Sequence, residues 1–142
     1  MNARLAARCA LRGLAGAALA SALFPAWAGA AGSWVDEAPS VRLFTPGREV
    51  VSQPFKPPAP LASGEVTSIS WRFEPPPGAP RLEARLCHPQ RCQRLLAPRG
   101  KSDFLAGLSA AGPFVLRFRL PEATRPSAPL RVEGLQLIVN YR

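Results

Sequence analysis

The sequence contains a single histidine and only nine acidic residues, which is too little for most catalytic arrangements. A hydrolytic triad needs a histidine beside its nucleophile, and His88 has no serine in a G-x-S-x-G context near it. Paired carboxylates could support glycoside hydrolysis, but no spacing singles out a pair. The scattered candidates are Glu65, Glu74, Glu83 and Glu133. Glycine-rich loops that cradle phosphate are missing as well. The chain is therefore predicted not to be an enzyme.

Cysteine is equally scarce, and its distribution argues against a metal or redox centre. Cys87, His88 and Cys92 supply at most three of the four ligands that zinc prefers, and the sequence has no second cluster of cysteine and histidine. A thioredoxin-like centre needs C-x-x-C near a βαβ pattern, whereas four residues separate Cys87 from Cys92. No metal or other cofactor is therefore expected.

Long apolar runs are absent after Ala31, but one lies at the N-terminus. Arginines without acids precede an apolar stretch at residues 13–30, which ends in the small residues "AGA". This order is typical of a secretory signal peptide, and cleavage is expected after Ala30, with Ala28 as the alternative. A retained membrane anchor is the competing interpretation, although the run is short and rich in glycine and alanine. We therefore expect residues 1–30 to be a signal peptide and residues 31–142 to be one exported domain without stable membrane insertion.

Export leaves two cysteines in an oxidising compartment, where a disulfide is the default. Residues 81–87 alternate between polar and apolar side chains, as a half-buried strand does, and "CQRLL" resumes after "HPQR", whose Pro89 suits a tight turn. Cys87 and Cys92 would then face each other across a hairpin, with His88 solvated in the turn. A staple across so short a loop contributes about 2 kcal/mol on the chain-entropy model.

The rest of the exported chain shows the same alternation of apolar and polar residues. It runs through "EVTSISWRFE", "PFVLRFRLP" and "LQLIVNYR", which are separated by proline-rich connections that suit neither helices nor central strands. Helix signals are nearly absent, apart from a short candidate at residues 102–112. These features predict an all-β fold, a small antiparallel sandwich or barrel with one disulfide-stapled hairpin. The predicted aromatic core is Trp34, Trp71, Phe73, Phe114 and Phe118.

Acidic residues are also outnumbered. The chain has 18 basic and 9 acidic residues; removing the three arginines of the leader leaves 15 against 9, a net charge of +6. Several arginines alternate with core positions, which favours a solvated sheet face over a dedicated binding patch. A basic surface can still meet acidic proteins, polysaccharides or lipids. Nucleic acid is not an expected partner, because export separates the protein from the nucleic acids of the cell and no nucleic-acid-binding motif is present.

Four segments of the exported chain together resemble the flagellar FlhE family of Gram-negative bacteria. They are "AGSWVDE" at 31–37, "SISWRFE" at 68–74, "RLCHPQRC" at 85–92 and "QLIVNYR" at 136–142. The paired cysteines and the closing "IVNYR" are the most specific of them. The resemblance spans nearly all of residues 31–142.

The resemblance implies a periplasmic accessory factor of flagellum assembly with a β-rich fold and no enzymatic activity. Members of the family are associated with chaperoning that prevents filaments from forming in the wrong space, and with limiting proton leakage through the export gate. The implied partners are flagellar rod subunits or the basal-body and export proteins that face the periplasm. The sequence does not specify the oligomeric state.

A partner could be captured by strand addition at an exposed sheet edge, with outward arginines steering an acidic subunit. The terminal strand 135–142 is the candidate edge, and an internal strand sealed on both sides is an equal alternative. The predicted partner-binding residues are Ile138, Asn140, Arg142, Arg85, Arg117 and Arg119. The competing functional class is a secreted β-sandwich that binds an acidic polysaccharide or an envelope protein.

Overall fold

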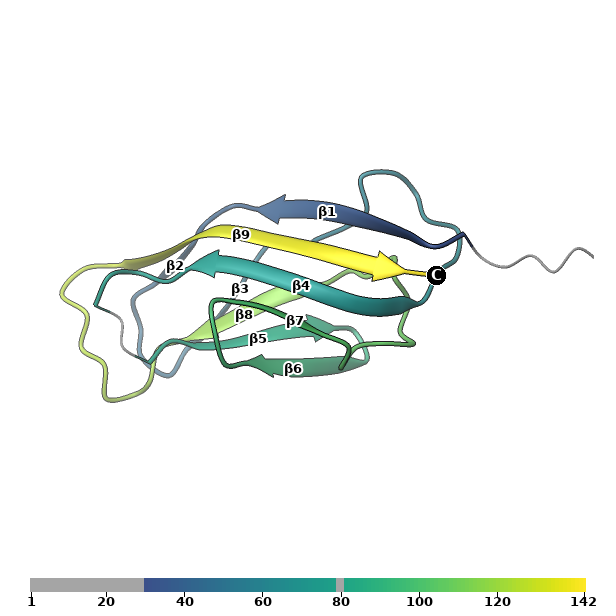
Figure 1. Cartoon of the computed structure of the whole chain (residues 1–142). Helices are drawn as coiled ribbons and strands as arrows, with labels where there is room; N and C mark the ends of the chain where they lie inside the picture. Colours follow the sequence, from purple (N-terminus) through teal and green to yellow (C-terminus); the bar gives the residue numbers. More distant parts are fainter. Residues whose placement is uncertain (1–29, 79–80) are drawn as a thin grey trace, which may run out of the picture.

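The computed structural model describes residues 30–78 and 81–142, and the predicted signal peptide lies almost wholly outside this part. The described residues form two antiparallel sheets packed face to face, as Figure 1 shows. The prediction of an all-β sandwich is confirmed. The strands are β1 (Gly32–Ala38), β2 (Val41–Leu43), β3 (Glu49–Val51), β4 (Val66–Glu74), β5 (Glu83–His88), β6 (Arg91–Leu95), β7 (Arg99–Ser102), β8 (Val115–Arg119) and β9 (Leu130–Tyr141).

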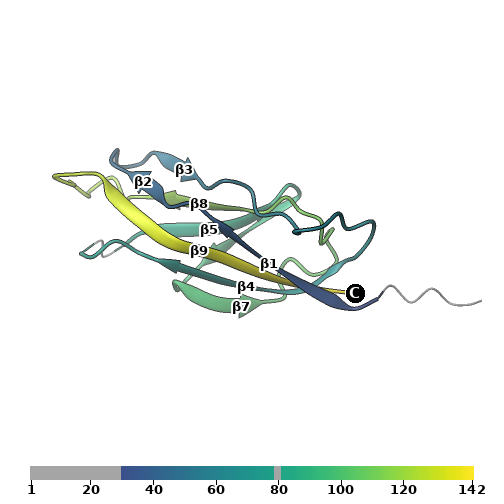
Figure 2. The ribbon, with the colours of Figure 1, turned by 90° about the horizontal axis from the view of Figure 1, so that it is seen from above.

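The first sheet has the strand order β1-β9-β4-β7, and β2 pairs with the beginning of β9. The C-terminal strand β9 therefore lies between β1 and β4, as Figure 2 shows from above. The prediction that strand 135–142 forms an exposed edge is wrong, because both sides of its backbone already pair with neighbouring strands. The internal alternative is the correct one.

The second sheet has the order β3-β8-β5-β6. Its two central strands, β8 and β5, present one row of side chains to the first sheet and the next row to solvent, because successive strand residues point to opposite faces. Leu86 and Leu116, which pair across β5 and β8, are both fully buried. Arg85 and Arg117, one residue earlier and one later, point outward.

The core lies between the two sheets and contains every aromatic residue predicted for it. Trp34, Trp71, Phe73, Phe114 and Phe118 are all buried. Phe73 of β4 meets Phe118 of β8 edge to face with ring centroids 5.1 Å apart, and Trp34 packs on Phe114 at 5.9 Å. Such contacts join the two sheets with the tilted geometry that aromatic rings prefer.

Two local expectations are wrong. Residues 102–112 form a series of turns instead of a helix, closed by hydrogen bonds such as the one from the amide of Ala106 to the carbonyl of Asp103. His88 is 6% exposed instead of solvated, because only Pro89 and Gln90 form the turn and β5 continues through His88. The period of the strand then directs its side chain inward, like Ala84 and Leu86. No helix in the described part of the chain is long and apolar enough to cross a membrane.

Candidate interaction surface

Three arginines stand side by side on the outer face of the second sheet. Arg117 of β8 lies directly opposite Arg85 of β5, and Arg85 lies directly opposite Arg94 of β6. Neighbouring strands are about 4.8 Å apart, so like charges in this register repel one another. We call Arg117, Arg85 and Arg94 the arginine row. In the next row towards the strand ends the charges alternate in sign, because Arg119 stands between Glu49 and Glu83.

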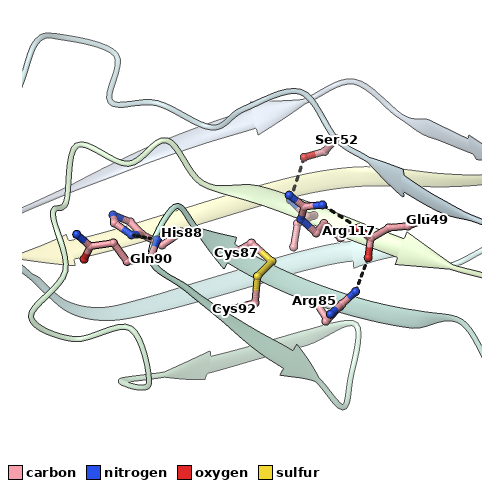
Figure 3. Close-up of a disulfide and its surroundings, with 9 residues drawn as sticks. Glu49, Ser52, Arg85, Cys87, His88, Gln90, Cys92 and Arg117 are labelled. Carbon is pink, nitrogen blue, oxygen red and sulfur yellow. Dashed lines mark hydrogen bonds and ion pairs between the residues drawn. A yellow bond between two sulfur atoms is a disulfide. The ribbon is translucent and has the colours of Figure 1, made fainter.

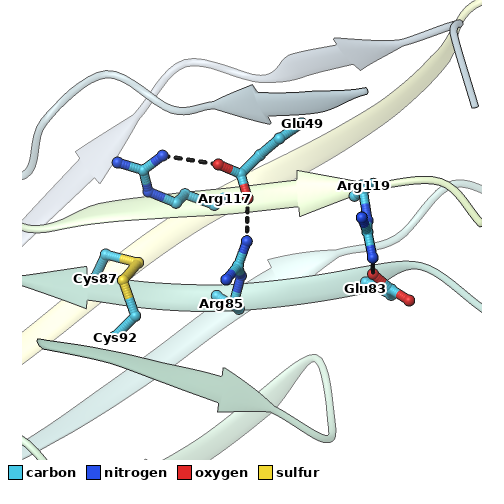
Figure 4. Close-up of polar contacts among 7 residues, drawn as sticks. All are labelled: Glu49, Glu83, Arg85, Cys87, Cys92, Arg117 and Arg119. Carbon is cyan, nitrogen blue, oxygen red and sulfur yellow. Dashed lines mark hydrogen bonds and ion pairs between the residues drawn. A yellow bond between two sulfur atoms is a disulfide. The ribbon is translucent and has the colours of Figure 1, made fainter. Parts of the chain in front are cut away.

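Glu49 of the edge strand β3 partly neutralises the arginine row. One of its carboxylate oxygens accepts a hydrogen bond from Arg117 at 2.7 Å and the other accepts one from Arg85, as Figure 4 shows. The hydrogen bond from Arg117, together with the one from Arg85, holds the pKa of Glu49 below its usual value despite partial burial. A single carboxylate thus serves two cations, and this fixes both guanidinium groups.

Arg94 has no ion-pair partner among residues 30–78 and 81–142. The carboxylate of Glu83 instead pairs with Arg119 at 2.7 Å, and this contact raises the pKa of the Arg119 guanidinium. The two rows therefore carry four arginines against two glutamates, and the excess positive charge is greatest at β6.

A shallow hollow of about 420 Å³ borders Arg94 where β6 ends. It is lined by Arg81, Leu82, Glu83, Arg94, Leu95, Leu96 and Pro121, and we call it the β5–β6 hollow. It shares Glu83 and Arg94 with a hollow that is also lined by Arg85 and Arg119. It shares Leu95 and Leu96 with a third hollow, which reaches Phe73 and Pro98. Leu96 is 90% exposed, the most exposed of the large apolar side chains in the described residues. The charged side chain of Arg94 and the apolar side chain of Leu96 are thus exposed at the same hollow.

The predicted disulfide is confirmed and lies at the turn end of the same hairpin. Cys87 and Cys92 are directly opposite one another on β5 and β6 and are bonded, as Figure 3 shows. Their register places Arg85 opposite Arg94 two residues further from the turn. The covalent staple therefore fixes the strands that carry two of the three arginines of the row.

His88 lies on the inner face beside this disulfide. Its ring packs on Phe114 with centroids 5.3 Å apart, and its Nδ1 accepts a hydrogen bond from the amide of Gln90 at 3.3 Å. Nε2 is buried without a well-formed hydrogen bond to any described residue, although the backbone of Ser109 is close enough to favour the protonated ring slightly. Burial dominates and lowers the pKa of His88. The imidazole is thus a core group.

The six residues predicted to bind a partner divide between two faces. Arg85, Arg117 and Arg119 are brought together on the second sheet, as Figure 4 shows. Ile138 and Asn140 lie on the outer face of the first sheet, where Asn140 donates a hydrogen bond to the hydroxyl of Ser68 at 3.1 Å. Arg142 follows β9, and its backbone pairs with Glu65. The two groups do not form one site.

Three members of the surface were missed by the sequence prediction, namely Glu49, Arg94 and Leu96. The position of Arg94 could have been predicted from the sequence, because pairing Cys87 with Cys92 fixes the register of the hairpin. Counting from that pair places Arg94 opposite Arg85. The position of Glu49 could not have been predicted, since Glu49 is 68 residues away in the sequence from Arg117, with which it pairs. Among the described residues, no group of three or more histidine, cysteine, aspartate or glutamate side chains could hold a metal ion.

A second hollow lies on the opposite side of the sandwich, beside β1. It has a volume of about 500 Å³ and is lined by Ser33, Trp34, Val35, the segment 57–61 and Tyr141. Apart from backbone groups its lining is almost entirely apolar, and the proline segment is anchored by the amide of Lys56, which donates to the carboxylate of Asp36 at 2.9 Å. It has no counterpart of the arginine row.

Comparison with known proteins relates this chain to flagellar proteins. Residues 40–142 match the family model described as Flagellar protein FlhE. The chain is 35% identical over 123 residues to Flagellar protein FlhE of Yersinia enterocolitica, covering 84% of this chain and 88% of that protein. It is 34% identical over 129 residues to Flagellar protein FlhE of Escherichia coli strain K12, covering 87% and 97%. The solved structure titled "Crystal Structure of FLHE" superposes with a TM-score of 0.73 at 33% identity, covering 79% of this chain and 97% of that one.

Proposed function

Because the chain belongs to the FlhE family of flagellar proteins, we propose that it is a periplasmic accessory protein of flagellum assembly. In this role it binds rod or export-gate components as a chaperone or regulator, and it prevents misplaced assembly or proton leakage. The role requires binding and no catalysis. Its partners are flagellar proteins.

The family match over residues 40–142 carries the flagellar part of the proposal. The arginine row supports the binding part, because a surface with more arginines than carboxylates attracts an acidic partner and speeds its association. The proposal does not use strand addition at β9, since that strand is internal.

The periplasmic part rests on the leader and on the disulfide. Residues 1–30 have the order of charged, apolar and small residues that directs a chain to secretion. The Cys87–Cys92 bond persists in an oxidising compartment such as the periplasm, and it would be reduced in most cytosols. Fractionation should place a shortened protein, beginning after residue 28 or 30, in the periplasm. A full-length protein retained in the cytosol would contradict export.

Crosslinking in flagellated cells tests the function. The tagged full chain is crosslinked with formaldehyde, purified from the periplasm, and its partners are identified by mass spectrometry. Recovery of rod or export-gate proteins is expected. A parallel sample expressing the protein without residues 2–30 is the control, because it should stay in the cytosol and recover none of them. Absence of flagellar proteins from the exported sample would refute the proposal.

The second candidate function is binding of an acidic polysaccharide of the envelope, which the exposed Arg94 favours. Retention on heparin that survives physiological salt would support it. Retention lost at that salt reflects only a basic surface, because screening weakens exposed charge interactions.

A further inference from the structure

Arg85 and Arg94 of the arginine row lie on the β5–β6 hairpin, next to the exposed Leu96. Arg94 and Leu96 line the same hollow. Each feature is unfavourable for the isolated protein. Like charges directly opposite one another on neighbouring strands destabilise a sheet, and one carboxylate, that of Glu49, is shared between Arg85 and Arg117. A leucine that is 90% exposed gains nothing from folding. Both costs disappear if a partner covers the hairpin.

The charge of the surface specifies the chemistry of that partner. Arg94 is unpaired among the described residues and faces the hollow, and Arg81 lines the same hollow. Guanidinium groups bind carboxylates through paired hydrogen bonds, so aspartate and glutamate side chains are the complementary groups. Leu82, Leu95 and Leu96 beside them offer contact for an apolar side chain. An acidic polysaccharide would satisfy the arginines and leave the leucines uncovered.

The hairpin is also rigid before any partner arrives. The disulfide joins β5 to β6 two residues from the Arg85–Arg94 pair, and Glu49 fixes the guanidinium of Arg85. Binding groups that are already ordered lose less conformational entropy on association. Trp71 adds a further restraint, because its indole N–H donates to the carbonyl of Ala97, next to Leu96, at 2.9 Å.

We propose that the arginine row and the β5–β6 hollow together bind a protein segment in which an apolar side chain stands beside aspartate or glutamate residues. The inference deepens the proposed function, on which it rests for the identity of the partner as a flagellar protein. Leu96 is the apolar contact at the centre, and Arg94 and Arg85 bind the flanking carboxylates.

Site-specific crosslinking tests this surface in flagellated cells. A photo-crosslinking benzoylphenylalanine replaces Leu96 in one full-length protein, and Val35 in another. Val35 is the matched position, since it is 45% exposed and lines the apolar hollow beside β1. The residue at position 96 should crosslink to a flagellar protein within a segment rich in aspartate or glutamate, and the one at position 35 should not.

Charge reversal supplies the second comparison. Arg94→Glu places a carboxylate opposite Arg85, and Arg42→Glu places one opposite Arg131 on the first sheet, so the two variants change charge and register alike. Arg94→Glu should lower the crosslinking yield at position 96 about tenfold, whereas Arg42→Glu should change it less than about twofold. Circular dichroism and intact mass verify that each purified variant is folded and disulfide-bonded.

The outcomes separate the surface from the function. Crosslinks to a flagellar protein from position 35 alone, or equal yields in the two arginine variants, would overturn the surface and leave the flagellar role intact. If neither position nor formaldehyde captures a flagellar protein, the proposed function fails with it. If position 96 crosslinks to no protein, and the purified wild type but not Arg94→Glu is retained on heparin at physiological salt, the proposal is overturned and the surface binds polysaccharide instead.

Discussion

The indole ring of Trp71 lies across Gly100, the residue directly opposite it on the edge strand β7. A Cβ atom at Gly100 would lie 2.3 Å from Cζ2 of Trp71, far inside van der Waals contact. The glycine therefore lets the ring cover the strand, and an aromatic side chain compensates for the missing side chain of its neighbour. The indole N–H is held by the carbonyl of Ala97, so the ring cannot move aside without losing a hydrogen bond.

Replacing Gly100 by alanine should destabilise the protein, although alanine suits a strand better than glycine does. Overpacking of this kind costs about 2 kcal/mol. Urea denaturation followed by tryptophan fluorescence measures the effect. Lys101→Ala is the control, because it changes an exposed position of the same strand and should stay within about 0.5 kcal/mol of the wild type. Equal stability of Gly100→Ala and the wild type would contradict the close contact.

Removing the disulfide by the double substitution Cys87→Ser and Cys92→Ser should lower the free energy of unfolding by about 2 kcal/mol, because the closed loop is short. Urea denaturation of the oxidised protein and of the variant measures the difference. The oxidised protein should also resist alkylation until it is reduced. Labelling of both thiols in freshly isolated protein would show that the bond does not form in the cell.

Much of the fold could be predicted because the alternation in β4, β8 and the second half of β9 is regular. A strand with one buried face repeats every two residues, and Ile69, Trp71 and Phe73 follow that period. The disulfide hairpin was predicted for a similar reason, since its contacts are local in sequence. Strand order was not predictable, because β9 finds β1 and β4 only through packing between distant segments.

The beginning of β9 was hidden by a β-bulge. The strand starts at Leu130, five residues before the alternation becomes visible, and its register against β4 shifts between Arg72 and Glu74. Gly134 adopts a φ of 61° there, a conformation that glycine reaches without strain. Val132 and Leu135 consequently both face the core, although they are three residues apart. A search of the sequence for strict alternation of apolar and polar residues therefore ends the strand at the bulge.

The exposed edge on which half of the binding prediction rested does not exist, because strand order could not be read from the sequence. Arg85 and Arg117 were correctly placed outward, and their alignment into a row needed the pairing of β5 with β8. Ile138 was chosen as part of an edge that the structure fills with β1 and β4. Leu96 carries no pattern of its own and is recognised only by its exposure beside Arg94.

Acidification should destabilise the protein through His88. Burial lowers the pKa of His88 in the folded state below the ordinary value of an imidazole, about 6.5. Between the ordinary pKa and the lowered folded pKa, the unfolded chain therefore binds a proton that the folded chain does not. The free energy of unfolding therefore falls as the pH drops through this window, and it stops falling on this account below the folded pKa. Urea denaturation across the range measures the slope.

The variant His88→Leu isolates the contribution of the imidazole to this slope. Its absolute stability can differ from that of the wild type, because the side chain packs on Phe114. Its stability should nevertheless be flat with pH in the window where the wild type loses stability. A variant with the same slope as the wild type would assign the pH dependence to another group.

Removing the carboxylate of Glu49 should expose the repulsion in the arginine row. In Glu49→Gln, Arg85 and Arg117 remain opposite one another without their shared anion, and the loss should be at most about 1 kcal/mol because the groups are partly solvated. Added salt screens like charges, so it should recover part of that loss in Glu49→Gln, while it weakens the ion pairs of the wild type. Urea denaturation at low and high salt measures whether added salt raises the stability of Glu49→Gln and lowers that of the wild type. Arg94→Glu is the complement, since it replaces a positive charge of the row by a negative one opposite Arg85 and should stabilise the protein most at low salt. If the free energy of unfolding depends on salt identically in all three proteins, the arginine row carries no appreciable repulsion. The excess of arginine on this face would then not lower the stability of the fold.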